Sequence, residues 1–162
     1  YFNRHPEVKL IIAPHVIDEN HLVEIIRKLK RPYVRYTRAD EKNVRKADCL
    51  IIDCFGLLSS IYRYGEIAYI GGGFGVGIHN TLEAAVYGIP VIFGSKYQKF
   101  QEAVQLLEAK GGFSIKNNEE LKTLLDRMLE DEVFLREAGM NAGAYVTDNA
   151  GATDKVLSMI NF

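Results

Sequence analysis

The sequence predicts an α/β fold in which a Rossmann-like parallel sheet is flanked by helices. Short apolar runs alternate with amphipathic stretches from one end of the chain to the other. The apolar runs are continuous rather than alternating with polar residues, which is typical of strands buried on both faces of a parallel sheet. A length of 162 residues with 48% hydrophobic residues suits one globular domain, 1–162, with a core of its own.

The predicted strands are short runs rich in aliphatic and aromatic residues. They cover residues 8–13, 33–36, 49–53, 67–70, 90–93 and 113–115. The first run ends at Pro14, and Pro32 stops the chain from continuing a helix into the second. Because ligands of such folds bind at the carboxyl ends of the strands, the turns that follow the strands are the candidate functional positions.

The first predicted helix begins at Asp18 and Glu19, and its apolar residues share one face. Gly88 is the expected C-terminal cap of a later helix, and Gly111 and Gly112 are expected to terminate the one after it. The helices after the first are predicted over residues 57–64, 81–87, 100–109, 119–129, 133–145 and 153–160.

Composition excludes several classes of function. The net charge of −1 gives no argument for nucleic acid, and no apolar run approaches 18 residues, so we expect a soluble chain without a membrane span. Cys49 and Cys54 are expected to be reduced, and no metal-ligand spacing is present. Residues 1–7 have the composition of a linker, and a start at Tyr1 suggests a fragment of a longer protein.

The strongest local signal is Gly71–Gly77, in which five of seven residues are glycine between a predicted strand and a predicted helix. Such a loop can approach a ligand closely and turn N–H groups toward a phosphate, although a flexible connector is the plainer interpretation. The spacing matches neither a P-loop nor a dinucleotide fingerprint. The predicted phosphate loop comprises Gly72, Gly73, Gly75, Gly77 and His79.

Polar residues follow directly. Asn80 and Glu83 have the spacing of a capping box, yet a carboxylate at Glu83 is also suited to accept hydrogen bonds from two ribose hydroxyls. His79 either donates to a phosphate or packs under the loop. His15 lies directly after the first strand and is a candidate ligand contact, and Asp53 is expected to cap the helix near Leu57.

Charge is unevenly distributed along the chain. Residues 27–46 contain nine basic and two acidic side chains. Such a segment is usually a solvated face, and an anionic membrane surface is the sharper interpretation.

Several motifs resemble those of 3-deoxy-D-manno-octulosonic acid (Kdo) transferases. The core of the resemblance is 68–73, 77–85 and 88–94, with its centre at His79-Asn80-Thr81-Leu82-Glu83. Supporting stretches that resemble the same family are Ile11-Ile12-Ala13-Pro14-His15, Asp53-Cys54-Phe55-Gly56 and Asn149-Ala150-Gly151-Ala152-Thr153.

The resemblance implies the C-terminal, donor-binding half of a two-domain GT-B glycosyltransferase that transfers Kdo from CMP-Kdo to a lipid A precursor in lipopolysaccharide biosynthesis. It places the CMP contacts at Pro14, His15, Phe55, Gly56, Leu57, Asn80, Thr81, Leu82 and Glu83. Two positions depart from the family pattern: His15 stands in a turn where the family has arginine, and Leu57 stands where it has glutamate.

The resemblance also implies what this chain lacks. The family's catalytic base and its membrane-associated acceptor site lie in the N-terminal domain, so we expect no catalytic residue here and no transfer by this fragment alone. CMP-Kdo is a substrate, and no cofactor or metal is implied. The full protein is expected at the cytoplasmic face of the bacterial inner membrane, as a peripheral protein. The alternatives are a donor domain for a UDP-sugar and a non-catalytic nucleotide-binding domain.

Overall fold

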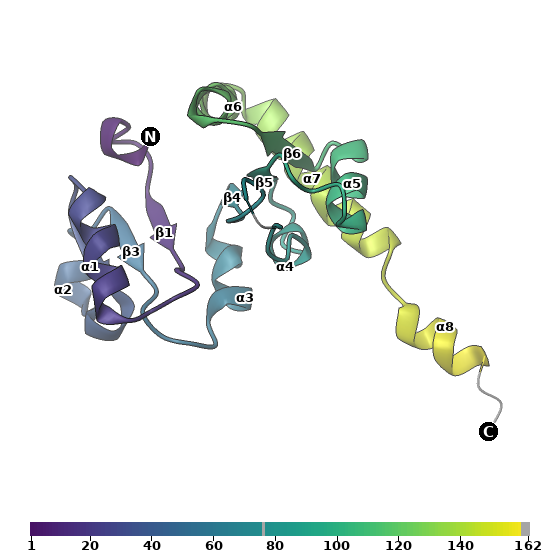
Figure 1. Cartoon of the computed structure of the whole chain (residues 1–162), viewed down its shortest axis with the longest axis horizontal. Coiled ribbons are helices and arrows are strands. Elements are labelled where there is room, and N and C mark those ends of the chain that lie inside the picture. Colours follow the sequence, from purple (N-terminus) through teal and green to yellow (C-terminus); the bar gives the residue numbers. More distant parts are fainter. Residues whose placement is uncertain (76, 160–162) are drawn as a thin grey trace. The chain divides into compact units, whose positions relative to one another are not determined.

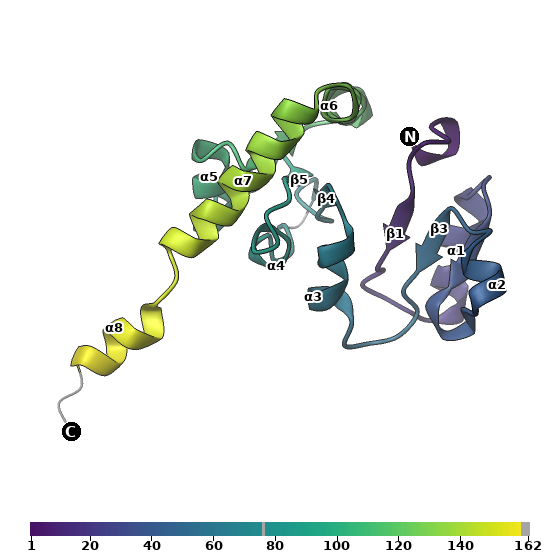
Figure 2. The same cartoon turned by 180° about the vertical axis from the view of Figure 1, so that it is seen from behind.

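The computed structural model describes residues 1–75 and 77–159, and the chain divides into two compact units, Tyr1–Ile61 and Tyr62–Phe162. Each unit contains a three-stranded parallel sheet with helices beside it (Figures 1 and 2). The predicted class, parallel strands flanked by helices, is confirmed. The strands form two three-stranded sheets, whereas one continuous sheet was expected.

The first unit has strand order β1-β3-β2, so the sheet's central strand is the last of the three in the chain. Its elements are η1 (Phe2–Arg4), β1 (Leu10–Ile12), α1 (Glu19–Lys28), β2 (Tyr33–Arg35), η2 (Tyr36–Arg38), α2 (Glu41–Val44), β3 (Cys49–Ile51) and α3 (Leu58–Ile61). As predicted, α1 begins after Asp18, whose carboxylate accepts a hydrogen bond from the backbone N–H of His21 at 3.0 Å. Its Leu22 is fully buried and packs with Cys49 and Ile51 of β3.

Residues 1–7, predicted as a linker, instead pack onto the first unit. Phe2 is buried in its core, and the guanidinium of Arg31 lies 4.1 Å from the centre of the Phe2 ring. The same guanidinium donates to the carbonyl oxygens of Phe2 at 2.9 Å, His5 at 2.7 Å and Val8 at 2.8 Å. One arginine thus satisfies several backbone acceptors, which composition alone does not reveal.

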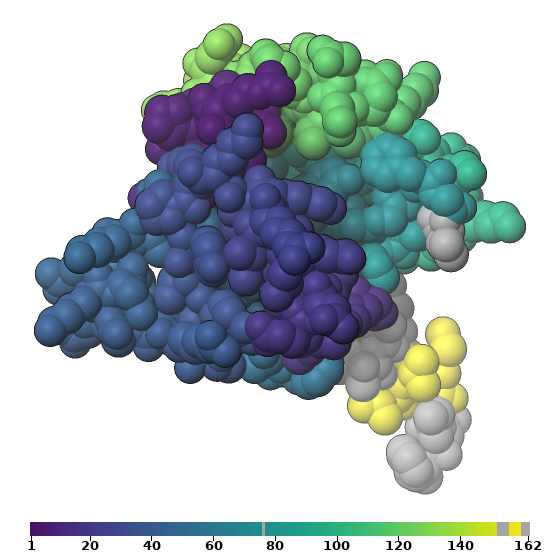
Figure 3. All heavy atoms as spheres, turned by 60° about the vertical axis from the view of Figure 1, so that its left-hand side comes forward, coloured from purple at the N-terminus to yellow at the C-terminus, as the bar shows by residue number. Residues whose placement is uncertain are grey.

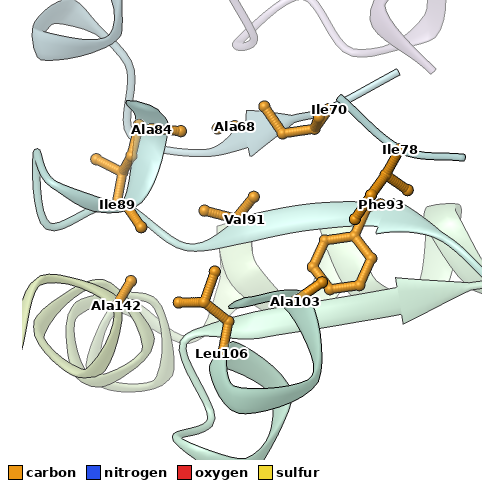
Figure 4. Packing of buried hydrophobic residues seen from close by; sticks show 11 residues of the cluster. Ala68, Ile70, Ile78, Ala84, Ile89, Val91, Phe93, Ala103, Leu106 and Ala142 are labelled. Carbon is orange, nitrogen blue, oxygen red and sulfur yellow. The ribbon is translucent and has the colours of Figure 1, made fainter. Parts of the chain in front are cut away.

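The second unit has strand order β4-β5-β6. Its elements are η3 (Tyr62–Tyr64), β4 (Ala68–Tyr69), α4 (Leu82–Ala85), β5 (Val91–Gly94), α5 (Gln101–Glu108), β6 (Gly112–Ile115), α6 (Asn118–Glu130), α7 (Glu132–Asp148) and α8 (Ala152–Met159). Figure 4 shows Val91 and Phe93 of β5 between residues of α4, α5 and α7, including Leu106 and Ala142. The predicted helices are confirmed in outline, and the end predicted for the last one, Ile160, lies outside the described residues.

Two local predictions differ from the structure. Lys110, with φ +61°, takes the left-handed conformation after α5, where Gly111 and Gly112 were expected to terminate the helix. Gly111 is needed for space instead, because a Cβ there would lie 2.5 Å from the backbone nitrogen of Ala142. The sequence analysis also missed α2, a four-residue helix with no buried residue, which is held by a capping box of Asp40 and Asn43.

Asp53, at the end of β3, holds the edge of the first sheet together rather than capping a helix near Leu57. Its side chain is 1% exposed and accepts hydrogen bonds from Arg35 Nε at 2.8 Å, Thr37 Oγ1 at 2.6 Å and Thr37 N at 2.9 Å. Burial alone raises the pKa of a carboxyl, but the bonds from Thr37 and Arg35 outweigh burial and lower the pKa of Asp53 to about 2.

We therefore expect Asp53→Asn to lower the free energy of unfolding by about 2–3 kcal/mol at pH 7, since Arg35 loses a buried charged partner. Because the folded-state pKa lies below the unfolded value of about 3.9, the folded state binds fewer protons between these values. The contribution of Asp53 is thus complete above about pH 4 and is lost as the pH falls toward 2.

Denaturant unfolding of the wild type and the variant between pH 7 and pH 2 measures both effects. The matched control is Asp148→Asn at the exposed end of α7, for which we expect a change of about 0.5 kcal/mol or less. Equal stability of Asp53→Asn and the wild type at pH 7 would contradict the role given to Asp53.

Candidate functional site

The predicted contacts of the first unit lie at one edge of its sheet. Pro14 and His15 follow β1, and residues 54–57 follow β3, which is the parallel neighbour of β1. The Ile52 N–H donates to the carbonyl of Ile12 at 2.8 Å, so the pairing continues to the point where the two turns begin. The structure thus brings these two predicted groups to the same carboxyl edge.

The turn after β3 presents an aromatic ring and open backbone. Phe55 is 84% exposed, and Gly56 has φ +86° with open space on the side where a Cβ would project. Leu57 is half-buried, so it offers an apolar surface and its backbone. The hydrogen bonds of Asp53 hold the backbone two residues before Phe55, so the turn that carries the exposed ring is anchored to the sheet at its first residue.

The glycine-rich segment is a closed loop pinned to the turn after β5. The Gly73 N–H donates to the carbonyl of Gly77 at 3.3 Å, and the His79 N–H donates to the carbonyl of Gly71 at 3.3 Å. The Lys96 N–H donates to the carbonyl of Gly73 at 2.8 Å, which ties the loop to the neighbouring strand's turn. The amides of Gly73 and His79 are therefore committed within the protein.

Close packing explains most of the glycines in this loop. A Cβ on Gly73, which has φ +79°, would lie 2.7 Å from the Cα of Gly94, and one on Gly77 would lie 2.3 Å from the Phe100 ring. A Cβ on Gly72 would lie 2.3 Å from the carbonyl oxygen of Gly77. Gly75 has open space around it and is the position of this loop best placed for a ligand.

Asn80 and Glu83 form a polar pair at the start of α4. Asn80 Oδ1 accepts from the Leu82 N–H at 3.0 Å, and Asn80 Nδ2 donates to Glu83 Oε1 at 3.0 Å. Glu83 Oε2 accepts no hydrogen bond from residues 1–75 or 77–159 and the side chain is half-buried. The predicted capping box does not form, because the N-cap of α4 is Thr81 and the two side chains bind each other. The pair orients one carboxylate oxygen of Glu83 and leaves the other for a donor.

The charge of Glu83 acts on a neighbouring phenol. Burial, and then the negative charge of Glu83, raise the pKa of Tyr62. Sequence reasoning missed Tyr62, since no local pattern links it to α4.

Thr81 differs from its neighbours because it is fully buried. Its hydroxyl has no hydrogen-bond partner among the described residues. Leu82 is half-buried against the core of the second unit, whereas His79 is exposed. In this structure only the flanking residues present side chains at the surface, and Thr81 does not.

Other kinds of site find less support. No group of three or more His, Cys, Asp or Glu suited to a metal occurs within the described ranges. A hollow of about 580 Å³ lies over α5, β6 and α6, and none of the predicted site residues line it. Among the helices that the structure describes, none combines the length and apolar character needed to cross a membrane.

Known proteins resemble this chain in sequence. The 3-deoxy-D-manno-octulosonic acid transferase of Aquifex aeolicus is 37% identical over 124 residues, which are 75% of this chain and 34% of that protein. The transferase of the same name from Chlamydia muridarum is 29% identical over 157 residues, 94% of this chain and 35% of that protein. A bifunctional glycosyltransferase/methyltransferase of Fusobacterium nucleatum is 32% identical over 74% of this chain and 19% of its own length. No family model matches.

A solved structure has the same fold. The C-terminal CMP-Kdo binding domain of WaaA from Acinetobacter baumannii matches with a TM-score of 0.75 over 90% of this chain and 77% of that domain, at 18% identity. The resemblance inferred from the motifs is thus confirmed, and the fold is that of a Rossmann-like C-terminal GT-B domain. The chain spans about a third of the length of the Kdo transferases that it matches, 34% and 35%.

The packing around the loop predicts that substitutions of Gly73 and of Gly75 differ in their effect on stability. Gly73→Ala should lower the free energy of unfolding by about 2–4 kcal/mol, because it combines a positive φ with a clash against Gly94. Gly75→Ala is the matched control and should change stability by less than about 1 kcal/mol. Thermal or denaturant unfolding compares them, and equal effects would contradict the packing described here.

Thr81→Val replaces an unpartnered buried hydroxyl with a methyl group of similar size. We expect the free energy of unfolding to stay unchanged or to rise by about 1 kcal/mol, since no hydrogen bond is lost and an unsatisfied polar group is removed. A loss of more than about 2 kcal/mol on denaturant unfolding would show that the hydroxyl has a partner in solution.

Proposed function

We propose that this chain is the donor-binding half of a glycosyltransferase that transfers Kdo from CMP-Kdo to a lipid A precursor in lipopolysaccharide biosynthesis. The observation that carries the proposal is the 37% identity to a Kdo transferase over 124 residues. The fold shared with a CMP-Kdo binding domain is consistent with it. On this proposal the whole polypeptide has two domains, and 1–162 is its nucleotide-sugar-binding part.

The residues of the second unit suit the sugar of a nucleotide. Glu83 Oε2 is available to accept hydrogen bonds from the two ribose hydroxyls, while Oε1 stays bound to Asn80. Gly75 leaves room for a phosphate to approach the loop backbone. Since CMP carries a single phosphate, backbone donors at this loop are proposed to hold it as the leaving group without a metal.

The turns after β1 and β3 of the first unit also carry residues that suit a nucleotide. The exposed ring of Phe55 is suited to stack on a pyrimidine base, and such stacking contributes about 1–3 kcal/mol per base in other proteins. The other proposed contacts of this unit are Pro14 and His15 at the same sheet edge, with Gly56 and Leu57. His15 is expected to substitute in part for the arginine that stands in this turn in the family.

The chemistry itself is assigned to the other domain of the whole protein. Its acidic base is proposed to deprotonate the acceptor hydroxyl, which then displaces CMP from the anomeric carbon of Kdo with inversion. The same domain is proposed to meet the lipid A precursor, with the full protein bound peripherally to the cytoplasmic face of the inner membrane. Transfer of Kdo by the longer polypeptide, and none by 1–162 alone, is the expected result.

Calorimetric titration of the chain with CMP tests the nucleotide assignment. Glu83→Ala should weaken CMP binding by about 1–3 kcal/mol, the usual effect of losing a charged acceptor. Glu83→Gln should weaken it less, because the amide oxygen still accepts from Asn80 and the NH2 group can donate to one hydroxyl oxygen. Glu137→Ala on α7 is the matched control and should bind CMP as the wild type does.

The same titration with UDP separates the alternatives. Tighter binding of UDP than of CMP would favour a UDP-sugar donor domain. Unchanged CMP binding by a folded Glu83→Ala variant would leave Glu83 as a partner of Asn80 alone and contradict the proposed ribose contact.

A further inference from the structure

Basic side chains gather at the amino-terminal edge of the first sheet, opposite the edge that carries the predicted ligand contacts. The exposed members are Arg4, Arg27, Lys28, Lys30, Arg45 and Lys46, and two exposed apolar residues, Tyr33 and Val44, lie among them. We name these eight residues the basic patch. Figure 3 shows their segments, purple for η1 and indigo to blue for 27–46, on the surface of the first unit.

Backbone contacts bring these segments together. The carbonyl oxygen of Pro32 accepts hydrogen bonds from the N–H groups of Asp48 at 2.8 Å and Cys49 at 3.1 Å, so the turn before β2 lies against the turn before β3. Asn3 donates to the carbonyl of Lys28 at 2.8 Å and accepts from the Lys30 N–H at 2.9 Å, which places η1 at the same edge. These hydrogen bonds hold the segments that carry the basic patch next to one another within the first unit.

The cations of the patch have no ion-pair partner within the described chain. The nearby carboxylate of Asp48 is bound to Lys9 and Arg31, and that of Glu7 to His5 at 3.0 Å. None of the six basic residues of the patch forms an ion pair with residues 1–75 or 77–159. Lys9, Arg31 and Arg35, which also lie at or near the sheet, have carboxylate partners.

We infer that the basic patch docks this chain on the surface of an anionic lipid bilayer. Its cations are distributed over the ends of several elements rather than converging on one point, which suits a diffuse negative surface. Tyr33 is 43% exposed and Val44 is 49% exposed, and such residues favour the interfacial layer of a bilayer. A sequence pI of about 6.5 is unlike that of nucleic-acid-binding domains.

The position of the patch suits a bound chain that still accepts ligand. Pro14 and Phe55 follow the carboxyl ends of the strands, whereas the patch lies at their amino ends, so contact with a membrane leaves those turns open. The inference extends the membrane association of the proposed function to a surface of this chain. Its test does not depend on nucleotide binding.

Sedimentation with vesicles of phosphatidylethanolamine and phosphatidylglycerol, at about 0.1 M salt, tests the inference. The variant Lys28→Gln/Lys30→Gln/Lys46→Gln should bind on the order of 100-fold more weakly than the wild type, since three surface charges are lost. The matched control, Lys110→Gln/Lys116→Gln/Arg136→Gln, loses the same charge from exposed positions of the second unit and should bind as the wild type does. CMP titration should give the same affinity for all three proteins.

Support requires binding to anionic vesicles that the patch variant loses, the control retains, and phosphatidylcholine vesicles do not show. Absence of binding to anionic vesicles, or an equal loss in both variants, would overturn the inference. Tighter binding to a single-stranded RNA than to vesicles, lost in the same patch variant, would overturn it in favour of nucleic acid. Absence of CMP binding by the wild type would count against the proposed function and would not bear on the membrane inference.

Discussion

The contact of Gly73 with Gly94 determines where the β4–α4 loop lies in the second unit. These two backbones approach so closely that neither position has space for a Cβ atom, and the Lys96 N–H bonds the carbonyl of Gly73 beside them. The loop is thereby fixed to the end of β5, and Asn80 and Glu83 follow it at a defined place. The position of the Glu83 carboxylate therefore depends on glycine at both Gly73 and Gly94, where a side chain would push the loop away from β5.

In the first unit, charge has two separate uses. Arg31 and Arg35 are turned inward, where they bind backbone carbonyls, Asp48 and Asp53 and thereby hold the N-terminal segment and the end of β3. The remaining basic residues of the same segment are exposed. A run of nine basic residues in the sequence is therefore not one feature, and only the structure separates its structural members from the patch.

Sequence patterns located the strands and most helices because apolar runs and helix caps are local signals, as at Asp18 before α1. The same patterns identified the glycine loop, whose phosphate contacts stay a prediction, but they did not show the close packing at Gly72, Gly73 and Gly77. A Cβ on Gly77 would meet the ring of Phe100, which is distant in the chain, and Asp53 binds Arg35 and Thr37 rather than a nearby helix. Such contacts depend on tertiary packing, which no local pattern contains.

The central claim is that the carboxylate of Glu83, which Asn80 orients at the start of α4, binds the ribose of CMP. Amide NMR spectra of the labelled chain titrated with CMP test it most directly. The account predicts saturable shifts at Gly75 and at residues 80–83. Saturable shifts confined to the hollow beside α6, or no shifts at millimolar CMP, would contradict it.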